Sequence, residues 1–138
     1  MTARLGNLRP LRPMRVLLVT DDVRYADRVA AAAALLGVPV IVSPTDENVD
    51  ATAARAAPNV VVFDAEDAFS HMARVASAFA AIHPQMAVAI VASRATERRT
   101  GSLLVFDRWR SAERLLGELE RAYVGLRVAR EDHLLGGE

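Results

Sequence analysis

Acidic residues follow two apolar runs of the chain, and their side chains are the ones best suited to chemistry. Asp21 and Asp22 come soon after the run 16–19, and Asp64 directly follows the run 60–63. If these runs are neighbouring parallel strands, their carboxyl ends meet at one edge of a sheet, which is where open α/β folds bind ligands. Carboxylates that lie so close together raise one another's pKa unless a cation lies among them. Mg²⁺ is a suitable cation because it prefers oxygen ligands. The spacing therefore predicts a metal or phosphoryl site.

The same residues have a purely structural alternative. Aspartate is common at strand-to-helix turns because its side chain accepts hydrogen bonds from the first backbone N–H groups of a helix. Asp21 would then cap the first helix, and Asp64 would start a later one. Capping alone does not explain three carboxylates at the same end of two strands, so the chemical interpretation is favoured.

The elements that must position these residues alternate along the chain. Five short apolar runs predict strands, and they are continuous rather than alternating, as in a parallel sheet covered on both faces. The runs are 16–19, 38–42, 60–63, 87–91 and 103–106. Helical patterns lie between them or after the last one, at 25–36, 49–57, 69–82 and from Ser111 onward. The fold class predicted is a single α/β domain with helices on both faces of a five-stranded parallel sheet.

One connection is too short for this scheme. Only residues 94–101 join the fourth run to the fifth, whereas a parallel crossover usually takes about a dozen residues. We expect the fourth helix to be missing or reduced to about one turn. The domain limits predicted are a flexible tail over 1–14, the domain over 15–126, and a helix extension or frayed tail over 127–138.

Composition excludes several classes of function. The chain has 138 residues, with 17 acidic and 17 basic side chains, so no net charge draws it toward nucleic acid or a membrane surface. It has no cysteine, which removes disulfides and thiolate metal sites and fits a cytoplasmic location. All basic side chains are arginine, so no lysine is available. There is also no glycine-rich nucleotide cradle after the first run.

The chain resembles the receiver domain of bacterial two-component response regulators over about residues 14–125. The resemblance is carried by 16–22, which is similar to the family's first strand with its acidic pair, and by 60–64, which is similar to the strand that ends in the phosphoacceptor aspartate. Ser93 falls where the family has a hydroxyl residue, and Arg108 falls where it has lysine. The resemblance implies a flavodoxin-like sheet with strand order 2-1-3-4-5.

The resemblance also implies a chemistry. Asp64 would take a phosphoryl group from a phosphohistidine of a histidine kinase or phosphotransfer protein, and would later release it by hydrolysis. Mg²⁺ would be held by Asp21, Asp22, Asp64 and the backbone carbonyl of Glu66, while Ser93 would receive a phosphoryl oxygen. The protein would then be a switch that changes its binding to a downstream regulatory protein, rather than a metabolic enzyme.

Several positions depart from the family pattern. Arg108 is a planar fork in place of a lysine ammonium, and the proline that follows the lysine in the family is Trp109. Glu66 and Asp67 add negative charge beside a group that should accept a dianion, and Val105 replaces an aromatic switch residue. Two functions remain open: an atypical receiver phosphorylated on Asp64, and a phosphorylation-independent pseudo-receiver that acts as a protein interaction module.

Two further segments are candidate surfaces for binding other proteins. Arg94, Arg98 and Arg99 form a basic loop that is either a solvated turn or a docking patch for an acidic partner. The last helical pattern continues past Leu126, which indicates either fraying or pairing with a second copy in a homodimer. No helix-turn-helix pattern follows, so direct binding of nucleic acid is not expected.

Overall fold

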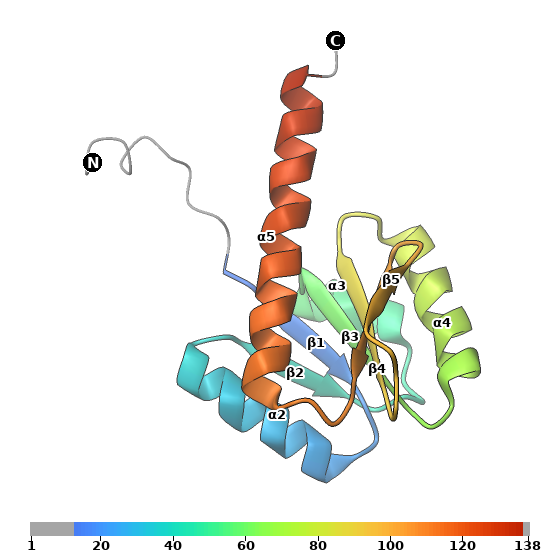
Figure 1. Ribbon diagram of the computed structural model, residues 1–138. Coiled ribbons are helices and arrows are strands. Elements are labelled where there is room, and N and C mark those ends of the chain that lie inside the picture. Colours follow the sequence, from blue (N-terminus) through green and yellow to red (C-terminus); the bar gives the residue numbers. More distant parts are fainter. Residues whose placement is uncertain (1–12, 137–138) are drawn as a thin grey trace.

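The computed structural model describes residues 13–136, with side chains up to residue 125 (Figure 1). The tail was predicted over residues 1–14, of which 1–12 lie outside this range, as do the last two residues of the chain. In chain order the elements are β1 (Val16–Val19), α2 (Val23–Leu36), β2 (Val40–Ser43), α3 (Val49–Ala56), β3 (Val60–Glu66), α4 (Phe69–Ile82), β4 (Ala87–Ala92), β5 (Arg98–Thr100), β6 (Leu103–Asp107) and α5 (Ala112–Gly136).

Five of the strands form the parallel sheet that the sequence predicts. The order across the whole sheet is β2-β1-β3-β4-β6-β5, and the first five of these strands are parallel to their neighbours. Val16 of β1 lies between Val40 of β2 and Val60 of β3, so the acidic residues after β1 and at the end of β3 share one edge of the sheet. The α/β fold class and this parallel strand order are confirmed.

Helices cover both faces of the sheet because alternate strand residues point to opposite sides. Val16 and Leu18 belong to a buried cluster that α2 and α5 cover, and Leu17 and Val19 belong to a second cluster on the side of α3 and α4 (Figure 1). Met14 is also buried in the first cluster. Continuous apolar strands are the sequence consequence of this two-sided burial.

The connection between β4 and β6 contains no helix, in agreement with one predicted alternative, but it corrects the predicted number of strands. It contains a strand, β5, which pairs antiparallel with β6 and makes the sheet six-stranded, instead of a turn of helix. The chain must return along the sheet before β6 can run parallel to β4. Eight residues of helix advance only about 12 Å, whereas eight extended residues reach about 26 Å. An extended return is therefore the conformation that a link this short allows, and Gly101, with φ of 60°, closes the hairpin turn.

Glu97 connects this hairpin by hydrogen bonds to the segment that follows β6. Its Oε2 accepts hydrogen bonds from the backbone N–H of Asp107 at 3.1 Å and from Nε of Arg110 at 2.7 Å. Its Oε1 accepts from Nη2 of the same arginine. This arginine lowers the pKa of the Glu97 carboxyl below its ordinary value. The β5 link is thus tied to the loop from which Arg108 projects.

The last helix runs further than the sheet that it covers. α5 has 25 residues, and its C-terminal half extends away from the sheet (Figure 1). Ser111 caps its start as predicted, because its hydroxyl accepts a hydrogen bond from the N–H of Arg114 at 3.3 Å. Within the described part of the chain, no helix combines the length and apolar character needed to span a membrane.

Replacing Glu97 by alanine should loosen β5 selectively. We expect faster hydrogen exchange of the amides in 94–101 and a loss of about 1 kcal/mol or less in global stability, because the ion pair is near the surface. Exchange followed by mass spectrometry measures the first effect, and urea unfolding measures the second. Glu118→Ala, which removes an exposed i,i+3 pair with Arg121, is the matched control. Unchanged exchange in the link would contradict this role of Glu97.

Candidate functional site

Asp64 is the buried centre of the site. It lies inside β3, which continues to Glu66, and its side chain has 0% exposure. The pairing of β3 with β4 shifts between Asp64 and Glu66, and the bulge leaves Glu66 at a φ of 52°. Asp64 is therefore a strand residue that pairs with Val91 of β4, one position beyond the last pair of β3 with β1. The alternative in which it starts a helix is wrong, since α4 begins at Phe69 after Ala68.

Arg108 supplies the charge that Asp64 needs. Its Nε donates to Oδ1 of Asp64 at 2.7 Å, and its Nη2 donates to Oδ2 at 3.0 Å, which is the bidentate geometry of an arginine fork on a carboxylate. Nη2 also donates to Oδ2 of Asp22 at 2.5 Å. Arg108 is only 4% exposed, so one buried guanidinium serves two carboxylates. Hydrogen bonding to Asp64 raises the pKa of Arg108 above its ordinary value.

The remaining hydrogen-bonding capacity of Asp64 is also used. The hydroxyl of Thr20 donates to Oδ2 at 2.6 Å, and the backbone N–H of Glu66 donates to Oδ1 at 3.1 Å. Each carboxylate oxygen thus accepts two hydrogen bonds. Both oxygens of the Asp64 carboxylate are therefore occupied, and the side chain is closed to solvent.

Aromatic rings enclose the guanidinium of Arg108. Its central carbon lies 4.5 Å from the centre of the Tyr25 ring and 5.5 Å from that of the Trp109 ring. Tyr25 is buried, and burial raises the pKa of its phenol well above the usual range, with the charge of Asp64 as a further cause. The ring therefore stays neutral and offers Arg108 its electron-rich face.

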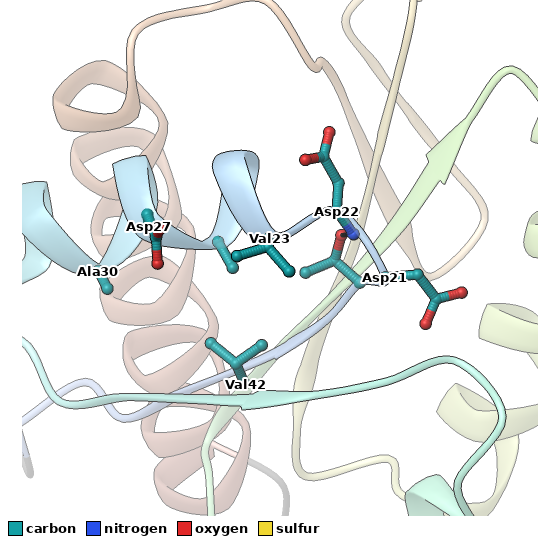
Figure 2. A pocket seen from close by; sticks show the side chains of 8 residues that line it. Asp21, Asp22, Val23, Asp27, Ala30 and Val42 are labelled. Atoms are coloured by element: carbon teal, nitrogen blue, oxygen red, sulfur yellow. Dashed lines mark hydrogen bonds between the residues drawn. The ribbon is translucent and has the colours of Figure 1, made fainter.

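The side chains of Asp21 and Asp22, the two acidic residues that follow β1, point in different directions. Asp22 is the N-cap of α2, where Oδ1 accepts from the N–H of Tyr25 at 3.1 Å, so the expectation that Asp21 caps this helix is wrong. Asp21 points away from Asp22 (Figure 2) and accepts hydrogen bonds from Thr45, with the backbone N–H at 2.9 Å. Arg108 lowers the pKa of Asp22, and Thr45 lowers that of Asp21.

The other predicted site residues lie at the rim. Ser93 is half-buried and follows β4, and its backbone N–H donates to the carbonyl of Glu66 at 2.8 Å. Its hydroxyl forms no hydrogen bond with another described residue and is not one of the groups that hold Asp64. The Glu66 carbonyl, which the resemblance assigns to Mg²⁺, is hydrogen-bonded to this serine.

These side chains do not fit a Mg²⁺ site. The expectation that Asp21, Asp22 and Asp64 converge is wrong, because Asp21 is turned to Thr45. Among residues that the structure describes, no group of three acidic or histidine side chains is placed to hold a metal ion. Arg108 lies between the other two carboxylates, so a side chain already provides the positive charge there.

Two residues of the site were not given a role from the sequence. Thr20 directly follows β1, and a polar residue at the end of a predicted strand is a signal that the sequence contains. Its hydroxyl also accepts a hydrogen bond from the N–H of Asp22 at 3.0 Å. Tyr25 lies three residues after the N-cap, and no sequence signal marks it, because its role comes from the packing of α2 beside the loop after β6.

The arrangement defines a flavodoxin-like α/β domain with an acidic site at the carboxyl edge of its sheet. Among solved structures it is similar to NtrX from Brucella abortus in complex with ADP, with a TM-score of 0.73 and 21% identity over 90% of this chain. The same protein in complex with ATP gives 0.68 and 22%. This chain covers 29% of the NtrX chain in each case.

A third similar structure is an atypical orphan response regulator, described as revealing a phosphorylation-independent regulatory mechanism. The TM-score is 0.60 at 16% identity, over 80% of this chain and 95% of that one. No protein family model and no curated protein matches the chain. The structural similarities show that the domain has a receiver-like fold.

Removing Arg108 should destabilise the protein because it leaves Asp64 buried without a counter-charge. We expect Arg108→Met to lower the free energy of unfolding by about 3–5 kcal/mol. Adding Asp64→Asn should recover a large part of this loss, since the amide is neutral and still accepts from Thr20. Urea unfolding of both single variants and the double variant measures the coupling. Losses that simply add would contradict the ion pair as the organising contact.

The charge of Asp22 should make stability depend on acid pH. Because Arg108 lowers the pKa of Asp22 in the folded state, this contribution is complete above the ordinary carboxyl range of about 3.9 and is lost as the pH falls through the folded value. Asp22→Asn keeps the cap but removes the charge. The stability difference between wild type and this variant should be present at pH 7 and vanish in acid, as measured by urea midpoints. A difference that persists unchanged in acid would contradict it.

Proposed function

We propose that this protein is a pseudo-receiver, a protein interaction module that uses the receiver-like fold without phosphorylation. The observation that carries the proposal is the bidentate ion pair of Arg108 with Asp64. In this state the carboxylate has four hydrogen bonds and no exposed surface, so it has no free oxygen for attack on a phosphohistidine.

The charge arrangement supports the same function. Mg²⁺ would have to displace a guanidinium that is held by two carboxylates and enclosed by two aromatic rings. The phosphorylation-independent mechanism of the atypical response regulator that shares this fold is a precedent for such a protein. Regulation would then come from binding of a downstream regulatory protein, and a histidine kinase is not required.

The second candidate is an atypical receiver that accepts a phosphoryl group on Asp64 with Mg²⁺. The observation in its favour is that Asp22 and Asp64 share one cation at the carboxyl edge of the sheet. For phosphoryl transfer, Arg108 would have to leave Asp64, and the metal would have to take its place. The two candidates therefore differ in what a phosphoryl donor does to the protein.

Trp109 offers a direct test because it is the only tryptophan and lies beside Arg108. We expect Mg²⁺ followed by beryllofluoride or acetyl phosphate to leave its fluorescence unchanged, and intact mass to show no phosphoryl adduct. Arg108→Lys should give a saturable Mg²⁺ response, because an ammonium cannot hold both oxygens of Asp64 in a fork. An adduct on the wild type that is absent from Asp64→Asn would overturn the pseudo-receiver function in favour of the second candidate.

A further inference from the structure

A groove separate from the buried ion pair lies between α2 and the edge strand β2 (Figure 2). Its walls are apolar and come from Val23, Ala26 and Ala30 of α2 and from Val42 of β2. Its volume is about 230 Å³. This is below the range of about 300–1,000 Å³ for pockets that take drug-sized ligands, and it suits one long side chain.

The apolar walls of the groove are exposed. Val23 is 71% exposed and Val42 is 44% exposed, although valine is normally buried. Val23, Asp27 and Ala30 are spaced i, i+4 and i+7, so they share one face of α2. No described strand lies beyond β2, so the groove is open along the edge of the sheet.

The groove carries negative charge that the described side chains do not neutralise. The carboxylate of Asp27 forms no hydrogen bond or ion pair with the described residues, and that of Asp21 is bonded only to the neutral Thr45. Asp22, which also lines the groove, shares its charge with Arg108. No basic side chain lines the groove.

We propose that this groove binds an arginine side chain presented by a partner protein. The aliphatic stem would lie between Val23 and Val42, and the guanidinium would reach the carboxylate of Asp27 on the same face of α2. Arginine suits such a site because its stem covers apolar surface while its planar head forms paired hydrogen bonds with carboxylates. A purely apolar side chain would leave the carboxylate of Asp27 beside it without a partner. The inference supplies a docking surface for the interaction module proposed above.

The test is a titration of the full ¹⁵N-labelled chain with a synthetic peptide, acetyl-Ala-Leu-Arg-Leu-Ala-amide, followed by amide chemical shifts. We expect saturable shifts in 21–30 and 40–45. The same peptide with citrulline in place of arginine should bind roughly tenfold more weakly or worse, because it keeps the shape and loses the charge. Asp27→Arg should weaken binding of the arginine peptide similarly, and Asp67→Arg, an exposed carboxylate outside the groove, should not.

Each other outcome overturns the proposal. Equal binding of the citrulline peptide would show that the groove recognises apolar surface and not the positive charge. Shifts confined to another surface would place the binding site elsewhere. Shifts of 21–30 on removal of residues 1–12, without peptide, would identify the occupant as the chain's own arginine-containing N-terminal segment. Shifts that depend on protein concentration alone would identify a second copy. Because none of these measurements uses a phosphoryl donor, their failure is distinct from failure of the pseudo-receiver function.

Discussion

The buried carboxylate of Asp64 sets the constraint on which the rest of the site depends. A charge without solvent must be paired and fully hydrogen-bonded, or the fold loses several kcal/mol. Either a bound metal ion or a basic side chain meets this requirement. Here the side chain of Arg108 reaches β3 from the segment after β6, across the intervening β4, and the fork geometry saturates both carboxylate oxygens. The ion pair therefore compensates the buried charge and occupies both oxygens of Asp64 in a single contact.

The position of Arg108 depends in turn on the irregular edge of the sheet. The link between β4 and β6 is too short for a crossover helix, so it returns as β5, and Glu97 within it holds the backbone of Asp107 and the side chain of Arg110. These two residues flank Arg108 in the chain. The hairpin thus fixes the segment from which the guanidinium of Arg108 reaches inward. The absence of a helix between β4 and β6 is therefore linked to the position of the buried ion pair.

The sequence predicted a parallel sheet and the edge where the site lies, because apolar runs buried on two faces are continuous and strand ends carry polar residues. The strand order came from the resemblance to receiver domains. It placed Asp22, Asp64 and Arg108 at the correct edge of the sheet. It failed for Asp21, since two consecutive residues after a strand diverge, and its partner Thr45 comes from a loop after β2. It failed for β5 because the length of 94–101 excludes a crossover helix but does not by itself indicate that the return along the sheet forms an antiparallel strand. The bulge before Glu66 has no local sequence signal.

The N-terminus of α2 is where the ion pair and the groove meet. Asp22 caps this helix, holds Arg108 from one side and lines the groove on the other. A positive charge bound in the groove would act on the same carboxylate as Arg108, because opposite charges a few ångströms apart attract each other. Binding at the surface would then weaken one of the contacts that hold Arg108 over Asp64. The contacts of Asp22 and Arg108 thus connect the surface of α2 to the buried carboxylate of Asp64.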